Sequence, residues 1–306
     1  MKNTYRFGCF LLAVICLFSF LTGCADNSED IKNIAPVEEA EIIPESDEAE
    51  GTTPIREDDG AEMPPDEAFQ EGEPVSEAAA PLFTYPAFDR ERYPAVCATT
   101  GVNVRAGAGM GTAVVGYLGT GRSLPYLETE GGWYKVWKDG AVGYVSAAYA
   151  YLADTCRAIE RIVDAGLDKL GTPYVWGAPR IINEYGEVSP YFTGKSFDCS
   201  SFVQYCYYVG DGVKLGNYTG SQADYTVGKV ITRYEELRRG DFYFTGNGSI
   251  SHVVIYMGGG RLLQAYSANG GPVSFTTDDR WRGKFISGRS VDLSVKDQFA
   301  ANAADR

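Results

Sequence analysis

The sequence predicts an α+β domain that follows a small all-β barrel, and three observations support this fold class. Between residues 93 and 153, short runs of β-branched and aromatic residues are separated by glycines, a pattern typical of a small barrel. Residues 154–170 then place Ile159, Ile162 and Leu167 at helical spacing. Short strand-like runs follow in the last third of the chain, and helices followed by such a run indicate an α+β domain with an antiparallel sheet.

The first 23 residues have the organisation of a secretory signal. Lys2 and Arg6 precede the apolar run Phe10–Leu21, which is short for a membrane-spanning helix of about 20 residues. We therefore expect residues 1–23 to be a cleaved signal rather than a retained membrane span. The ending Leu-Thr-Gly-Cys resembles the bacterial lipobox. This resemblance implies that Cys24 carries a lipid, which would hold the mature protein on a bacterial membrane, outside the cytoplasm.

Residues 24–92 are predicted to be a disordered linker that follows the lipid site. Residues 25–80 hold 19 acidic and two basic residues, whereas residues 81–306 are near neutral with 22 acidic and 23 basic residues. An acidic stretch with few aromatic residues cannot bury enough apolar surface to offset its ordering entropy. As a flexible tether it would span roughly 45 Å on average, although a purely solubilising tail would have the same composition. Since the chain has no basic stripe or basic tail, nucleic acid is not an expected partner.

The expected barrel, residues 93–153, resembles a known bacterial module. Its strands are expected in four runs, at 102–105, 114–117, 133–137 and 142–145. The sequences Asn-Val-Arg-Ala-Gly-Ala-Gly, Gly-Trp-Tyr-Lys-Val and Gly-Tyr-Val-Ser in this region resemble the bacterial SH3-type domain. The resemblance implies either that the domain binds wall components or that it packs beside a catalytic domain and shapes its cleft. The sequence leaves both roles open.

Two of the cysteines flank this barrel. An oxidising exterior permits disulfides, and a bond between Cys97 and Cys156 would stabilise the domain by restricting the unfolded chain. The sequence does not show whether their Cα atoms come close enough for a bond, so pairing stays open. Cys206 is expected to be a buried core residue.

The domain expected at residues 154–292 contains two recognisable helices. The first covers 154–170, with Asp154 or Thr155 as its cap. The second begins near Cys199 with Asp198 at its N-cap, and four residues are expected to face inward: Phe202, Val203, Cys206 and Val209. Strands are expected at 242–244, 252–257, 262–266, 273–276 and 284–286. Residues 293–306 are expected to be a frayed polar tail.

The chain contains a single histidine, His252, which can act as a base only if it has a nucleophile to serve and a group to orient it. Cys199 is the candidate nucleophile, because free backbone N–H groups at a helix start favour a thiolate. Its polar neighbours argue against an inert, buried thiol. Ser200 or Ser201 is an alternative nucleophile, but a thiol needs less activation than a hydroxyl.

Five motifs, in a fixed order between about 155 and 290, resemble the NlpC family of papain-like cell-wall cysteine peptidases. They begin at residues 171, 198, 237, 251 and 262, and they read Gly-Thr-Pro-Tyr-Val-Trp-Gly, Asp-Cys-Ser-Ser-Phe, Leu-Arg-Arg-Gly-Asp, Ser-His-Val-Val-Ile-Tyr-Met-Gly and Leu-Leu-Gln-Ala-Tyr. The resemblance implies a papain-like domain with Cys199 as nucleophile, His252 as base and Gln264 as the third catalytic residue. The family more often has His at that third position. A glutamine carbonyl can still accept from the imidazole N–H and fix its direction.

The same resemblance implies a substrate, the bond between γ-D-glutamate and a diamino acid in peptidoglycan stem peptides. It places Tyr174 beside the cleft. In members with a preceding SH3-type domain, the Asp and Ser that flank the Cys bind the free amine of an N-terminal L-alanine, and Asp198 and Ser200 match those positions. The sequence has no metal-ligand cluster and no phosphate loop, so no cofactor is expected. A monomer is the expected state.

Two other functions are compatible with these residues. One is an inactive wall-binding lipoprotein that keeps the catalytic fold, although the intact Cys199 and His252 favour an enzyme. The other is an amidase or acyltransferase on the same papain-like scaffold, which would share the nucleophile and act on a different bond. The sequence does not distinguish lysine from diaminopimelate as the diamino acid.

Overall fold

The computed structural model describes residues 82–225, 227–266 and 271–298. All of them lie in one unit of the chain, Gly72–Arg306. The predicted signal, Cys24 and the predicted linker up to residue 81 lie outside the described residues, as do residues 299–306. The last part of the predicted linker, residues 82–92, is held against the helix that begins at Arg157: Asp89 pairs with Arg157 and Arg161 at 3.0 and 3.1 Å, and its carbonyl accepts from the backbone N–H of Ala158. The prediction of disorder is therefore wrong for these residues.

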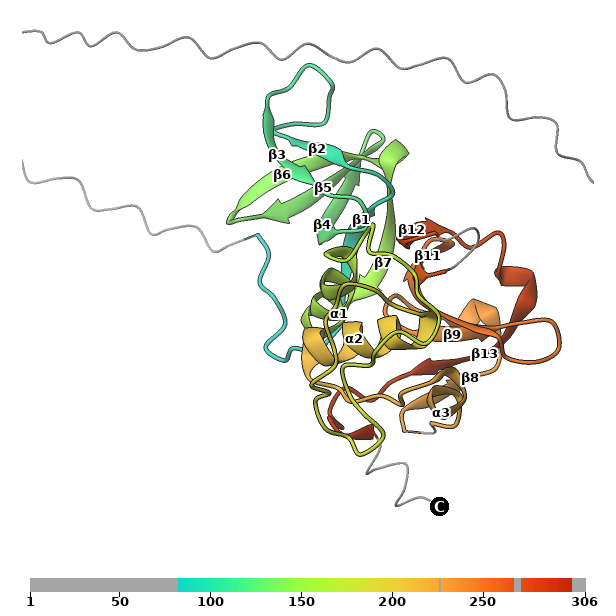
Figure 1. Ribbon diagram of the computed structural model, residues 1–306. Helices are drawn as coiled ribbons and strands as arrows, with labels where there is room; N and C mark the ends of the chain where they lie inside the picture. The colour runs from blue at the N-terminus through green and yellow to red at the C-terminus, as the bar shows by residue number, and fades with distance from the viewer. Residues whose placement is uncertain (1–81, 226, 267–270, 299–306) are drawn as a thin grey trace, which may run out of the picture. The chain divides into compact units, whose positions relative to one another are not determined.

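The first part is an all-β domain built on one antiparallel sheet (Figure 1). Its strands are β1 (Tyr93–Ala98), β2 (Val102–Arg105), β3 (Val114–Leu118), β4 (Ser123–Glu130), β5 (Trp133–Lys138), β6 (Ala141–Ser146) and β7 (Ala150–Thr155). They are ordered β3-β2-β6-β5-β4-β1-β7. Val96 of β1, Val104 of β2 and Val136 of β5 share one buried cluster, so strands far apart in the order curl around a common core. The predicted all-β unit is confirmed, and β1, β4 and β7 are strands that the sequence pattern did not predict.

Helix α1 begins later than predicted. Thr155 pairs with Tyr93 in the β1–β7 ladder, so Asp154 and Thr155 are strand residues and the prediction that one of them caps the helix is wrong. The helix covers Arg157–Leu167 with Cys156 at its N-cap. Ladder hydrogen bonds to β1 satisfy the backbone of this segment, and they prevail over the local capping preference of Asp and Thr.

Cys97 and Cys156 are both buried and both free. Thr155, the neighbour of Cys156, lies opposite Tyr93. Cys97 is four residues further along β1, which is about 13 Å along a strand. A disulfide requires Cα atoms less than about 7 Å apart, so the register of β1 and β7 keeps the two thiols apart.

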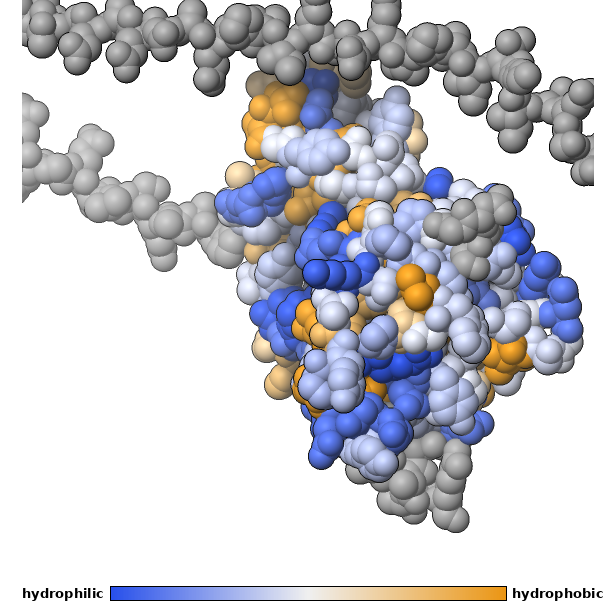
Figure 2. Space-filling view, viewed as in Figure 1, coloured by the Kyte–Doolittle hydropathy of each residue, from blue (hydrophilic) through white to orange (hydrophobic). Residues whose placement is uncertain are grey.

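The second part combines helices with a six-stranded sheet of order β12-β11-β10-β9-β13-β8. Its helices are α1, α2 (Cys199–Asp211) and the short α3 (Thr219–Ala223). Its strands are β8 (Lys229–Ile231), β9 (Phe242–Thr245), β10 (His252–Gly258), β11 (Arg261–Ala265), β12 (Val273–Thr277) and β13 (Phe285–Ser290). Neighbouring strands are antiparallel, which confirms the predicted α+β class. On the face of this part seen in Figure 2, apolar residues are scattered among hydrophilic ones.

Helices α1 and α2 lie side by side (Figure 1), and Gly210 allows their close approach. A Cβ atom on Gly210 would lie 2.4 Å from the Cα of Ile162, so no larger residue fits there. Because successive helical residues are about 100° apart, Val209 is turned away from α1 and is 50% exposed. The prediction that Val209 faces inward is therefore wrong, whereas Phe202, Val203 and Cys206 are buried as predicted.

Residues 293–298 are held in place, contrary to the frayed tail predicted from residue 293. The backbone N–H of Lys214 donates to the carbonyl of Lys296 (2.8 Å), and that of Gln298 donates to the carbonyl of Lys214 (3.2 Å). Leu293 is buried. The last described residues thus add a short backbone pairing beside the segment that follows α2.

A buried ion pair joins the all-β domain to the second part. The fully buried Arg239 donates to both carboxylate oxygens of Glu160 in α1, at 2.7 and 2.9 Å. The same guanidinium donates to the carbonyl of Gly121 in the all-β domain (2.9 Å) and to that of Met257 near the end of β10 (3.1 Å). Ser123 of β4 donates to Glu160 at 2.6 Å. The Leu-Arg-Arg-Gly-Asp motif thus supplies the cation of the domain junction.

Candidate active site

Cys199 is the first residue of α2, and a reciprocal cap explains why the helix starts there. The Asp198 carboxylate accepts from the backbone N–H of Ser201 (2.8 Å), and the Ser201 hydroxyl accepts from the backbone N–H of Asp198 (2.9 Å). This capping box confirms the predicted N-cap and fixes the first turn. The thiol therefore lies where backbone N–H groups lack helical partners and the helix dipole favours negative charge.

His252 and Gln264 meet across two neighbouring strands. His252 is the first residue of β10 and Gln264 belongs to β11. The side-chain oxygen Oε1 of Gln264 lies 2.8 Å from Nε2 of His252, and both residues are buried. His252 and Gln264 are twelve positions apart in the sequence. The structure brings them within hydrogen-bond distance.

Trp281, which the sequence analysis did not single out, fixes the direction of this hydrogen bond. Its indole N–H donates to the same Oε1 of Gln264 at 3.0 Å. An indole nitrogen is only a donor, so the atom facing it must be the amide oxygen. His252 therefore carries its proton on Nε2 and donates it to Gln264. The Trp281 ring also lies against the imidazole, with a centroid separation of 4.7 Å, and covers the hydrogen bond.

The ring nitrogen that remains for chemistry is Nδ1. Because Nε2 of His252 is committed to Gln264, Nδ1 is the unprotonated nitrogen that can accept a thiol proton. Burial lowers the pKa of His252 from 6.5 to about 4, the Gln264 hydrogen bond opposes this shift, and the positive charge of Arg280 adds to it. The imidazole is thus neutral at pH 7 and available as a base.

The Cys199 thiol faces the start of β10. Burial raises its pKa, and the negative charge of Asp198 raises it further. Three donors oppose this rise, namely the hydroxyl of Thr219, at 3.8 Å from Sγ, and the backbone N–H groups of Val253 and Ser200. Val253 follows His252 directly, so the thiol lies near the backbone at the start of β10. In the resting site the thiol of Cys199 and the imidazole of His252 are both neutral.

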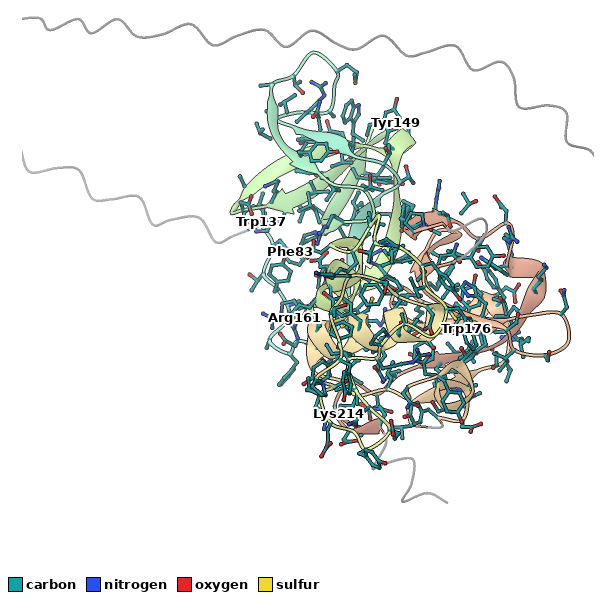
Figure 3. All side chains as sticks on the ribbon, viewed as in Figure 1. Phe83, Trp137, Tyr149, Arg161, Trp176 and Lys214 are labelled. Atoms are coloured by element: carbon teal, nitrogen blue, oxygen red, sulfur yellow. The ribbon has the colours of Figure 1, made fainter. Side chains whose placement is uncertain are left out.

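Tyr174 lies close to the nucleophile. It forms an isolated parallel bridge with Phe197, the residue before Asp198. Burial raises the pKa of Tyr174, and the nearby Cys199 and Asp198 raise it further, to about 12. Its hydroxyl therefore stays protonated and can donate. Two residues further on, Trp176 is 87% exposed and is labelled in Figure 3.

Asp198 and Ser200 contact a residue that the sequence analysis did not single out, Arg180. Nη2 of Arg180 lies 2.8 Å from Oδ2 of Asp198 and 3.2 Å from Oγ of Ser200. The Ser200 hydroxyl donates to Oδ1 of Asp198 at 3.1 Å. The backbone N–H of Gly177, which ends the first of the five motifs, donates to Oδ2 of Asp198 at 3.2 Å.

A groove runs beside Gln264 and Trp281. Its walls come from β11, β12 and the turn that follows, and they include Tyr266, Thr276 and Arg280. The Arg280 guanidinium lies over the Tyr266 ring, at 4.7 Å from its centroid, and donates to the Tyr266 hydroxyl. The groove therefore places a cation near His252.

The described part of the chain comprises residues 82–225, 227–266 and 271–298. No three potential metal ligands cluster there. No helix in these ranges is both long and apolar enough to cross a bilayer.

Comparisons with known proteins match the chain in two places. Residues 171–290 match the NlpC/P60 family, and residues 100–151 match the bacterial SH3 domain. The chain is 36% identical over 109 residues to peptidoglycan endopeptidase RipA of Mycobacterium tuberculosis, which covers 36% of this chain and 22% of RipA. It is 29% identical over 147 residues to the gamma-D-glutamyl-L-lysine dipeptidyl-peptidase of Bacillus subtilis, which covers 46% of this chain and 44% of that protein. The chain thus spans less than half the length of either curated relative.

A solved structure is also similar in sequence. The peptidoglycan hydrolase RipB of Mycobacterium tuberculosis is 29% identical, and the match covers 44% of this chain and 65% of RipB with a TM-score of 0.36.

Proposed function

We propose that the protein is a cysteine peptidase that hydrolyses peptide bonds of the bacterial cell wall, because residues 171–290 match the NlpC/P60 family and residues 100–151 match the bacterial SH3 domain. One observation carries the proposal. The hydrogen bond from His252 to Gln264, fixed by Trp281, leaves Nδ1 of the imidazole free as a base. The Cys199 thiol faces the same end of β10.

The reaction then follows in two steps. Nδ1 of His252 takes the thiol proton as Sγ of Cys199 attacks the amide carbonyl, and the backbone N–H of Cys199 stabilises the oxyanion. His252 returns the proton to the leaving amine, the C–N bond breaks and a thioester remains. His252 next takes a proton from water, the hydroxide attacks the thioester, and the new carboxylic acid leaves while the thiol is restored.

The bond we propose is the amide between γ-D-glutamate and the diamino acid of a stem peptide. The name of the Bacillus subtilis relative specifies a γ-D-glutamyl-L-lysine bond, and RipA is named a peptidoglycan endopeptidase. Gln264 is proposed as the orienting residue. Tyr174 is proposed to contact substrate, because its protonated hydroxyl lies near Cys199.

We also propose that the mature protein begins at a lipid-carrying Cys24 and acts outside the cytoplasm, with the acidic segment up to residue 81 as a tether. For the SH3 domain, wall binding is favoured over shaping of the cleft. Its polar contacts to the peptidase domain include those to Glu160, Arg239 and the carbonyl of Met257, and Arg122 pairs with Asp164 and Asp168 at the end of α1. Met257 lies near the end of β10, whereas His252 begins that strand.

The test is cleavage of defined stem peptides by the purified full-length protein, with products identified by mass. We expect one new amine and one new γ-carboxylate, and we expect Cys199→Ala and His252→Ala to abolish both. Release of a different fragment would indicate an amidase, and transfer of the acyl group to an added amine would indicate an acyltransferase. If no peptide yields product and Cys199 alkylates only slowly, the domain is an inactive wall-binding module.

A further inference from the structure

The polar pair that flanks the nucleophile is already occupied by a cation from the protein itself. Arg180 approaches both Asp198 and Ser200 with the same nitrogen, Nη2. The Asp198 and Ser200 residues are only 5% and 2% exposed. The charge of the carboxylate is therefore neutralised inside the protein, in a place where solvent screens little.

Both oxygens of the Asp198 carboxylate have partners inside the protein. An ionised carboxylate offers about four lone-pair directions, two on each oxygen. Oδ1 accepts from the backbone N–H of Ser201 and from the hydroxyl of Ser200. Oδ2 accepts from the backbone N–H of Gly177 and forms an ion pair with Nη2 of Arg180 at 2.8 Å. A substrate ammonium group would have to displace one of these donors before it could bind.

Arg180 is itself held in a fixed position. Its Nε donates to the carbonyl of Asn217 at 2.5 Å, and its Nη1 donates to the carbonyl of Ala178. Its side chain is 22% exposed. Because the guanidinium is planar and stays charged, contacts on three nitrogens fix its orientation. Moving it aside would break contacts to two separate loops as well as the ion pair.

Resting on the proposed peptidase function, we propose that Arg180 is a specificity-determining residue that occupies the position of a substrate ammonium group. The enzyme then has no requirement for a free N-terminal L-alanine. It accepts stem peptides whose L-alanine nitrogen is acylated, which is the form still joined to the glycan strand. This assigns the protein to the endopeptidases of intact wall rather than to the dipeptidyl-peptidases of released peptides.

The test compares two substrates with the full-length protein. One is L-Ala-γ-D-Glu linked to a diamino acid, and the other is the same peptide acetylated on the L-alanine nitrogen. We expect kcat/KM values within about threefold of each other. A site that depends on a buried polar contact to its substrate rejects the analogue lacking it by about 10⁴-fold or more. A loss of 100-fold or more on acetylation would therefore overturn the role of Arg180 while leaving the peptidase function standing.

Two variants then test the residue itself. Arg180→Gln removes the charge and frees Asp198. The ratio of kcat/KM for the free-amine peptide to kcat/KM for the acetylated peptide should therefore rise about tenfold or more. Arg180→Lys keeps the charge but loses the fixed guanidinium contacts, so it should shift the preference less than Arg180→Gln does. Equal use of both peptides by a folded Arg180→Gln variant would also overturn the proposal. If the variant does not fold, the wild-type comparison still decides. Failure of the wild type to cleave either peptide would contradict the proposed peptidase function instead.

Discussion

Replacement of Gln264 by Ala should reduce catalysis by a moderate, measurable factor. The change removes the acceptor of two donors, Nε2–H of His252 and the indole N–H of Trp281. A buried donor without an acceptor costs about 1–3 kcal/mol. The imidazole can avoid this cost by moving its proton to Nδ1, which is the atom that must accept the thiol proton. Holding the productive tautomer therefore costs about 1–3 kcal/mol, and kcat/KM should fall about 5- to 160-fold.

The assay is kcat/KM on one stem peptide for the wild type, Gln264→Ala and two comparison variants. Trp281→Phe removes one donor to the same oxygen but keeps the contact between Gln264 and His252, so its loss should be smaller. Gln264→His places an imidazole acceptor at the same position and should retain more activity than Gln264→Ala. If a folded Gln264→Ala protein, checked by circular dichroism, keeps more than half of the wild-type kcat/KM, orientation of His252 by Gln264 is not part of catalysis.

Three further predictions concern charge. Because burial lowers the pKa of His252 to about 4, the base stays neutral down to that pH. The acidic limb of kcat/KM should thus lie near pH 4, and a limb at pH 6.5 would contradict the neutral site. Arg280→Gln removes a positive charge that lowers this pKa, so the limb should move to higher pH, and an unchanged limb would show that Arg280 does not act on the imidazole. Glu160→Gln leaves Arg239 buried without its partner, which should lower the free energy of unfolding in urea by about 3–5 kcal/mol. Glu236→Gln, in an exposed pair, should change the free energy of unfolding little. An equal loss of stability in the Glu160→Gln and Glu236→Gln variants would refute the importance of burial.

The reaction centre could be predicted from the sequence because its members lie at the ends of regular elements. Cys199 follows an N-cap residue, and His252 and Gln264 belong to runs of apolar residues that form adjacent strands. Helix capping and strand patterns are local signals. They placed Cys199 at a helix start and His252 and Gln264 on strands. The role of Gln264 as the orienting residue was instead implied by the resemblance to the NlpC family.

The partners of these residues could not be predicted in the same way. Trp281 is 17 positions from Gln264 and Arg180 is 18 positions from Asp198, and both lie in irregular segments. No periodicity links an irregular segment to a strand or a helix start, because its course depends on long-range contacts. The same cause explains the errors at Thr155 and Val209. A ladder with β1 overrides the predicted cap, and the contact of Gly210 with α1 turns Val209 outward.

The charges around His252 set how the proposed chemistry begins. A carboxylate as orienting residue would stabilise the imidazolium and favour a thiolate–imidazolium pair before substrate binds. Here the orienting residue is the neutral Gln264, and Arg280 opposes a positive imidazole. The thiol of Cys199 is buried as well, which raises its pKa. Proton transfer must therefore accompany attack on the carbonyl rather than precede it. The resting thiol should consequently react slowly with small alkylating agents even in an enzyme that cleaves its substrate well, so slow alkylation indicates an inactive domain only when cleavage is also absent.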